Sequence, residues 1–154
     1  MFKTHLVLGL FLGLVSLQFL NVPYKLLFVL LVASFSSLPD IDHPKSKLGR
    51  KLFFLSWPIS LIFKHRGFFH SIFPPLFLFL FFNYVKLSFL AFAISIGYIS
   101  HLIGDAITKE GINFLHPFAN LRFQGPITTG GILERLIFFL LIFLDISYIF
   151  KLLI

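Results

Sequence analysis

The chain has 154 residues, of which 58% are hydrophobic and 12% are charged, with 24 Phe, no Cys and a formal net charge of +7. Soluble domains are about half apolar and about a quarter charged, so this composition indicates a single integral membrane domain over residues 1–154. The absence of Cys excludes disulfides and thiolate metal sites, and any bound metal must be held by His and carboxylate groups.

Apolar segments along the chain predict an all-α polytopic membrane bundle of about five transmembrane helices. The first segment follows Lys3 and resembles a signal peptide, but no small-residue cleavage site follows it, and we interpret it as a retained helix. A weaker segment, residues 52–63, contains Trp57-Pro58 and is interpreted as one interfacial or re-entrant helix. The five predicted spans cover residues 6–20, 25–38, 72–84, 87–103 and 133–150.

The charges predict how these spans are oriented. Ten of the thirteen Lys and Arg residues, Lys64 among them, fall on the side of the N-terminus, which leaves Lys25, Lys86 and Lys151 on the other side. Cationic loops of membrane proteins stay in the cytoplasm, so the N-terminus is predicted to be cytoplasmic. The positive charge therefore indicates topology and attraction to anionic lipid headgroups, and no nucleic-acid partner is expected.

His101 and Asp105 are four residues apart near the end of the fourth predicted span. This spacing places both side chains on one helix face, where an imidazole nitrogen and a carboxylate oxygen can bind the same divalent ion. The alternative is a His–Asp hydrogen bond that only satisfies two polar groups near a helix end.

Asp40 and Asp42 follow Pro39, which is expected to end the second helix at or before Leu38. Two carboxylates on a constrained turn repel each other unless a cation lies between them. The alternative is a solvated turn whose charge Lys45 and Lys47 neutralise.

His65, Arg66 and His70 precede the third predicted span, and Gly67 allows a sharp change of direction between them. Arg66 offers a planar fork for a phosphate or a carboxylate. The alternative is that these side chains only anchor the interface.

Two further groups fall on the same predicted side of the membrane. His5 begins the first helix, where a lone His is usually an interface residue. Glu134 begins the last helix, where a carboxylate suits the helix dipole, and its alternative role is that of a ligand or catalytic base. Asp145 lies apart from all of them, in the last span.

Three separate His/Asp loci at helix ends on one predicted side indicate a shared metal site. Two or more divalent ions would neutralise the carboxylates and acidify bound water for hydrolysis. Arg66 would then steady an anionic substrate.

The chain resembles the YdjM-like family of LexA-regulated, inner-membrane-associated metal-dependent hydrolases over nearly its whole length. Each fragment alone is common, but their combination is specific. The fragments that carry the resemblance are Thr4-His5, Leu38-Pro39-Asp40-Ile41-Asp42-His43-Pro44, His65-Arg66-Gly67 with His70-Ser71, and Ser100-His101 with Asp105.

The resemblance implies a multi-pass protein of a prokaryotic inner membrane with a His/Asp centre at its cytoplasmic face, holding two or three divalent ions such as Zn²⁺. It also implies hydrolysis of a phosphoester or lipid-like bond in an amphiphilic or anionic small molecule, with membrane lipids as partners. Asp42, Arg66 and Glu134 are the candidate catalytic residues. The implied metal ligands are His5, Asp40, Asp42, His65, His70, His101 and Asp105.

Two other classes compete with the hydrolase. A membrane transporter or metal-handling protein without hydrolytic activity usually places its site near the bilayer midplane between internal repeats, and no repeat is visible in this sequence. A structural membrane protein would use its His/Asp pairs only to satisfy one another. Metal analysis and ion flux in proteoliposomes separate these classes.

Overall fold

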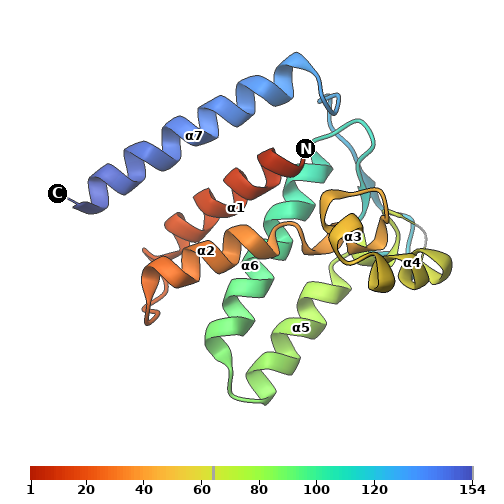
Figure 1. Cartoon of the computed structure of the whole chain (residues 1–154), viewed down its shortest axis with the longest axis horizontal. Helices are drawn as coiled ribbons and strands as arrows, with labels where there is room; N and C mark the ends of the chain where they lie inside the picture. The colour runs from red at the N-terminus through yellow and green to blue at the C-terminus, as the bar shows by residue number, and fades with distance from the viewer. Residues whose placement is uncertain (64, 154) are drawn as a thin grey trace.

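Each predicted apolar segment folds as a helix in the computed structural model, which describes residues 1–63 and 65–153 (Figure 1). Lys64, which the charge count includes, lies outside the described residues. The long helices are α1 (Phe2–Ser16), α2 (Lys25–Phe35), α5 (Phe73–Tyr84), α6 (Ser88–Ala106) and α7 (Ile132–Leu153). The short helical elements are η1 (Leu38–Asp42), α3 (Lys47–Lys51), α4 (Phe53–Ile62) and η2 (Phe68–His70), where η marks a 3₁₀ helix.

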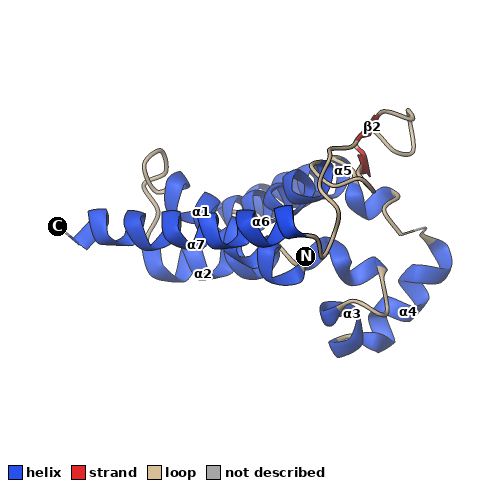
Figure 2. Ribbon diagram, turned by 90° about the horizontal axis from the view of Figure 1, so that it is seen from above, coloured by secondary structure: helices blue, strands red, loops and turns tan. Residues whose placement is uncertain are grey.

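A small β-hairpin departs from the predicted all-α fold. Strand β1 (Ile112–Asn113) pairs antiparallel with β2 (Arg122–Phe123), so that Ile112 faces Phe123 and Asn113 faces Arg122. Strands of two residues are too short to produce a period in the sequence, which is why hydropathy alone did not predict them. Figure 2 shows β2 on one side of the layer of long helices and α3 and α4 on the other.

Helix α6 lies at the centre of the bundle and packs against α1, α2 and α5, while α7 packs along α1 (Figure 1). The core between α1, α2 and α6 contains Leu14, Phe28, Val32 and Ala93. At Gly97 of α6, a Cβ atom would lie 2.5 Å from the Val32 carbonyl oxygen, so this helix crossing requires glycine. Close backbone approach through small residues is typical of helices packed within membranes.

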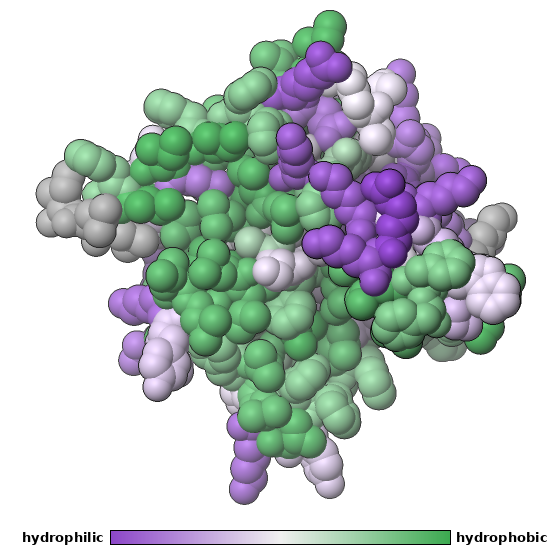
Figure 3. All heavy atoms as spheres, in the orientation of Figure 1, coloured by the Kyte–Doolittle hydropathy of each residue, from purple (hydrophilic) through white to green (hydrophobic). Residues whose placement is uncertain are grey.

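The outer surface of the bundle is strongly apolar away from one polar end. Four exposed Phe side chains illustrate this, each with between 66% and 72% of its surface exposed: Phe54 of α4, Phe77 of α5, and Phe139 and Phe143 of α7. Figure 3 shows hydrophilic residues gathered toward the upper right, with hydrophobic residues over most of the rest of that face. Apolar surface this extensive marks contact with a membrane or with other apolar partners.

Helix length supports fewer membrane spans than the five predicted from the sequence. Among the helices of residues 1–63 and 65–153, α6 alone is long and apolar enough to cross a bilayer, while α1, α4 and α5 are apolar but shorter. Helix α7 has 22 residues but includes Glu134, Arg135, Asp145 and Lys151. The five-span arrangement and the interfacial position of α4 therefore stay predictions.

Candidate metal centre

The ends of α1, η1, η2 and α6 meet near the N-terminus of the chain and bring all seven predicted ligands into one connected set. Pro39 occupies the first turn of η1 and fixes the backbone there, so that Asp40 and Asp42 follow α2 on a tight turn. The members of the set are His5 on α1, Asp40 and Asp42 on η1, His65 in the loop before η2, His70 on η2, and His101 and Asp105 on α6.

The centre of this set is a pair of buried imidazoles that face each other. The Nε2 atoms of His70 and His101 are 3.3 Å apart, and both rings are fully shielded from solvent. Asp105 Oδ2 lies 3.6 Å from the first nitrogen and 3.7 Å from the second, and Asp40 Oδ1 lies 3.8 Å from His101 Nε2. The two nitrogens thus lie close to an oxygen of Asp105 and to an oxygen of Asp40, and we call these four residues the central group.

The outer partners of the two rings determine where their protons lie. His101 Nδ1 is 2.7 Å from the Ser36 carbonyl oxygen, which can only accept a hydrogen bond, so Nδ1 carries a proton. His70 Nδ1 likewise donates to Asp42 Oδ2 at 3.1 Å. When both rings are neutral, each presents the lone pair of Nε2 to the other, beside an anionic oxygen, and a cation between them removes this repulsion.

The spacing of the central group fits zinc. Bonds of about 2.0–2.1 Å in a tetrahedral zinc site place neighbouring ligand nitrogens about 3.3 Å apart. The separation of the two Nε2 atoms is 3.3 Å, and the carboxylate oxygens stand a few tenths of an ångström farther out. A proton on one Nε2 is the alternative, since it would join the two rings by a hydrogen bond, whereas a metal ion can also bind the carboxylate oxygens.

Asp42 supports the central group from outside and links it to a second group. This carboxylate is buried and accepts hydrogen bonds from His65 Nδ1 at 2.8 Å, His70 Nδ1 at 3.1 Å and the Arg66 backbone N–H at 3.3 Å. Burial raises the pKa of Asp42, but the hydrogen bonds from His65 and His70 outweigh burial and lower the pKa to about 2. The ligand atoms of Asp42, His65 and His70 lie within 4.8 Å of one another, so these three residues could also hold an ion.

His5 forms a third group with the same α6 residues. Its Nε2 lies 3.3 Å from Asp105 Oδ1, and its ring stacks on His101 with the centroids 4.0 Å apart. Gly104 makes room for this ring, because a Cβ atom there would lie 2.7 Å from His5 Nδ1. Among the described residues, His5 Nδ1 has no hydrogen-bond partner. The ligand atoms of His5, His101 and Asp105 also lie within 4.8 Å of one another.

A family model described as YdjM inner membrane protein matches residues 1–152. The chain belongs to this family. It is 41% identical over 110 residues to Inner membrane protein YdjM of Escherichia coli (strain K12) and of Shigella flexneri, which covers 65% of this chain and 55% of each relative. It is 39% identical over 103 residues to YvsG of Bacillus subtilis (strain 168), covering 65% of this chain and 64% of that protein. The chain thus spans between half and two thirds of these relatives, and no solved structure matches it.

Arg66 lies at the edge of this YdjM-family centre. Its guanidinium is 3.5 Å from Asp105 Oδ2 and 3.8 Å from Glu110 Oε2, and it donates to the Gly111 carbonyl at 3.4 Å. The backbone of Arg66 adopts a positive φ of 60°, which turns the chain between His65 and η2. The side chain is 23% exposed, so it can meet both the buried carboxylate and a ligand arriving from outside.

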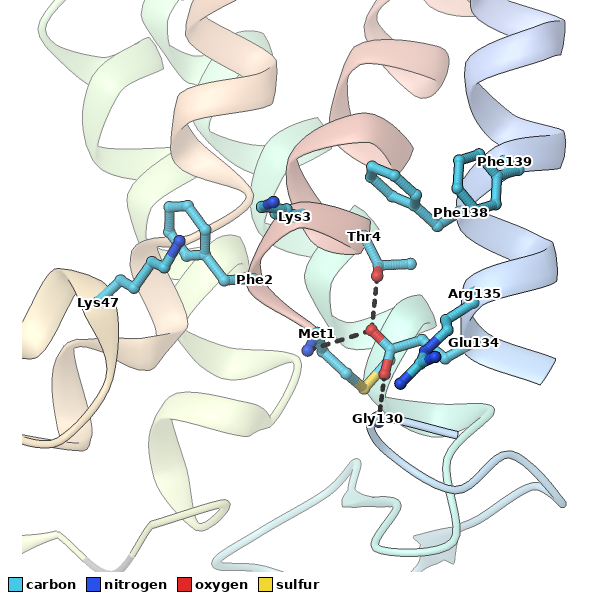
Figure 4. Close-up of a pocket in the computed structure, with 10 residues that line it drawn as sticks. All are labelled: Met1, Phe2, Lys3, Thr4, Lys47, Gly130, Glu134, Arg135, Phe138 and Phe139. Carbon is cyan, nitrogen blue, oxygen red and sulfur yellow. Dashed lines mark hydrogen bonds and ion pairs between the residues drawn. The ribbon is translucent and has the colours of Figure 1, made fainter. Parts of the chain in front are cut away.

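The structure does not bring Glu134 into contact with the predicted metal ligands. Its carboxylate lies 3.1 Å from the Met1 amino group, accepts a hydrogen bond from the Thr4 hydroxyl at 2.6 Å and accepts one from the Gly130 N–H at 2.6 Å (Figure 4). These contacts tie the start of α7 to the start of α1, beside a cavity of about 510 Å³. The expected catalytic role of Glu134 stays a prediction, and the contacts support a structural role.

Asp145 contrasts with Glu134 on the same helix. Its side chain is buried, and neither carboxylate oxygen has a hydrogen-bond partner within the described parts of the chain.

An unpaired buried carboxylate is destabilising, so Asp145→Leu is expected to raise the free energy of unfolding by on the order of 1–3 kcal/mol. Thermal unfolding in detergent measures this change, with Glu134→Leu as the matched control that lowers the stability. A lower melting temperature for Asp145→Leu would contradict this account.

Two contributors to the site were not predicted from the sequence. The Ser36 backbone carbonyl orients His101, and no sequence pattern identifies a backbone acceptor that lies 65 residues from its donor. His43 stacks on His65 with the ring centroids 4.5 Å apart. Burial, followed by the neighbouring His65, lowers the pKa of His43 and so favours its neutral form. The position of His43 directly after Asp42 was the available signal.

Proposed function

We propose that this chain is a metal-dependent hydrolase of a bacterial inner membrane that cleaves a phosphoester bond in a lipid-like substrate. The observation that carries the proposal is the facing pair of His70 and His101 Nε2 atoms, 3.3 Å apart and flanked by carboxylates. Such a pair is stable when a cation lies between the two nitrogens. The names of the enterobacterial relatives support the inner membrane as the location.

The central group would hold one Zn²⁺, while His5 with Asp105 Oδ1 and His65 with Asp42 Oδ1 would supply ligands to the others. An ion at such a site polarises a phosphoryl oxygen and lowers the pKa of bound water. Burial lowers the pKa of His70, which keeps its ring neutral and available as a ligand near pH 7.

The residues around the ions have separate tasks in this proposal. Arg66 orients the anionic group of the substrate, because its guanidinium is partly exposed at the edge of the centre. Asp42 positions the His65 ring through its 2.8 Å hydrogen bond. His65 lies at the outer edge of the set, where 38% of its side chain is exposed to an arriving substrate.

The proposed membrane arrangement has α1, α2, α5, α6 and α7 as spans, with α4 at the interface. The centre then lies at one end of the bundle, at the level of the lipid headgroups. The excess of Lys and Arg on the side of the N-terminus makes this side cytoplasmic.

Metal content and hydrolysis of one preparation test the proposal. The full chain is purified in a neutral detergent, its metals are measured by elemental analysis, and hydrolysis of bis(p-nitrophenyl) phosphate is followed before chelation, after chelation and after zinc is restored. Zinc should co-purify, and activity should be lost and regained with it. Asp42→Asn should lower zinc affinity by roughly 10- to 100-fold, because it weakens the support of His70.

Two results would contradict the hydrolase. Metal-free protein that stays metal-free in zinc would remove the basis of the proposal. Zinc-loaded protein that hydrolyses no phosphoester but carries zinc across proteoliposome membranes would favour the transporter class.

A further inference from the structure

A polar cavity of about 460 Å³ opens beside the metal centre. His65 and Arg66 form one wall of it, and Asn113 and Arg122 of the hairpin form another. The walls carry two guanidinium groups, of Arg66 and Arg122, and one carboxylate, of Glu110, so their net charge is positive. Arg122 is held by a 2.7 Å hydrogen bond from its Nη2 to the Glu110 carbonyl oxygen. The cavity therefore suits an anionic group next to the proposed ions.

An apolar cavity of about 280 Å³ adjoins the polar one at Ile112, which lines both. Its lining consists of apolar side chains alone, among them Leu102 and Ile103 of α6 and Phe114 and Phe123. Ile103 is 46% exposed, so this cavity opens on the outer surface of the bundle, where the proposed bilayer lies. A volume near the lower end of the range of ligand pockets, about 300–1,000 Å³, suits a single alkyl chain.

The hairpin separates the two cavities because side chains alternate along a strand. The cross-strand pair Asn113 and Arg122 lines the polar cavity. The neighbouring pair Ile112 and Phe123 lines the apolar cavity, where Phe123 packs edge-to-face on Phe114 with the centroids 5.8 Å apart. One short hairpin thus has a polar side, which lines the polar cavity, and an apolar side, which lines the apolar cavity.

We propose that the substrate is a single-chain anionic amphiphile that straddles this hairpin, with its phosphate in the polar cavity and its alkyl chain in the apolar cavity. This inference rests on the proposed function, since it names the substrate class of the same centre. Arg66 and Arg122 bind the phosphate, and the groove between α6 and the hairpin receives the chain. The chain enters sideways from the membrane past Ile103.

Binding of two phosphonates that differ only in chain length tests the inference. Radiolabelled dodecylphosphonate and methylphosphonate are titrated against the full chain in zwitterionic nanodiscs, and partition into empty nanodiscs is subtracted. Neither probe can be hydrolysed, so the readout does not depend on activity. Dodecylphosphonate should bind saturably and at least tenfold more tightly than methylphosphonate.

Three variants locate the two halves of the binding site. Arg122→Gln should weaken both probes several-fold, because it removes charge from the headgroup cavity. Ile103→Trp should fill the apolar cavity and weaken dodecylphosphonate alone. Leu136→Trp makes a similar apolar enlargement at an exposed position of α7, and should change neither affinity. Equal affinity for both probes, or undiminished dodecylphosphonate binding by Ile103→Trp, would overturn the inference.

The metal content and phosphoesterase activity of the same preparation separate the two proposals. Protein that loads zinc and hydrolyses bis(p-nitrophenyl) phosphate, but binds both phosphonates equally, retains the proposed function and loses the inference. Protein that lacks metal and activity, but prefers dodecylphosphonate and responds to Ile103→Trp, retains the two-part ligand site and loses the hydrolase.

Discussion

His101→Ala is expected to purify without the ion of the central group and to lose hydrolytic activity. Its Nε2 atom lies within 3.8 Å of ligand atoms of His70, Asp40 and Asp105, so its removal takes away the atom that the other three share as a neighbour. The loss of zinc affinity should exceed the roughly 10- to 100-fold change that follows the loss of an outer hydrogen bond. Elemental analysis and zinc titration of the purified variant measure it.

Ser100→Ala is the matched control for this change. Ser100 is equally buried on α6, and its hydroxyl donates to the Gly97 carbonyl of the same helix at 2.6 Å. It should keep both zinc and activity. If His101→Ala does not fold, His101→Gln supplies an amide donor to the Ser36 carbonyl without an imidazole, and should still lose zinc. Wild-type zinc content in a folded His101 variant would refute the assignment of the central group.

Gly104→Ala is expected to disrupt the His5 group while leaving α6 helical. The added methyl would lie 2.7 Å from Nδ1 and 2.9 Å from Cε1 of His5, so the ring must leave its stacked position on His101. Alanine favours helix more than glycine does, so the helix itself gains stability. Zinc affinity at this group should fall roughly 10- to 100-fold, as after the loss of ligand orientation.

A double-mutant cycle separates this effect from a general disturbance of packing. His5→Ala should cause a loss similar to that of Gly104→Ala, and the combined variant should be no worse than His5→Ala alone, because both changes remove the same ligand. Additive losses would show that the methyl group damages α6 packing independently of His5. Zinc titration of the four proteins gives the coupling.

The helices and the proximity of several His and Asp residues could be predicted from the sequence because each depends on local patterns. Long apolar runs predicted the segments that became α1, α2, α5, α6 and α7, since their side chains need an apolar environment. The spacing of His101 and Asp105 predicted that both side chains lie on one helix face. In the structure, His101 Nε2 lies 3.7 Å from Asp105 Oδ2. Pro39 predicted the turn that carries Asp40 and Asp42.

The features that were not predicted depend on contacts between distant parts of the chain. The Ser36 carbonyl became a partner of His101 only because Gly97 allows α2 to approach α6 closely. The hairpin is stabilised by pairing of residues about ten positions apart, with no repeat long enough to detect. Glu134 was predicted to be a catalytic residue on the same side of the membrane as the ligands, but its partners belong to the starts of α1 and α7.

Asp105 divides its two oxygens between neighbouring groups. Oδ1 faces His5, whereas Oδ2 faces His70, His101 and Arg66. An ion that fixes one oxygen also fixes the rotamer that presents the other, so occupancy of one group prepares the next. Zinc uptake should consequently be cooperative, with partly filled protein scarce during a titration.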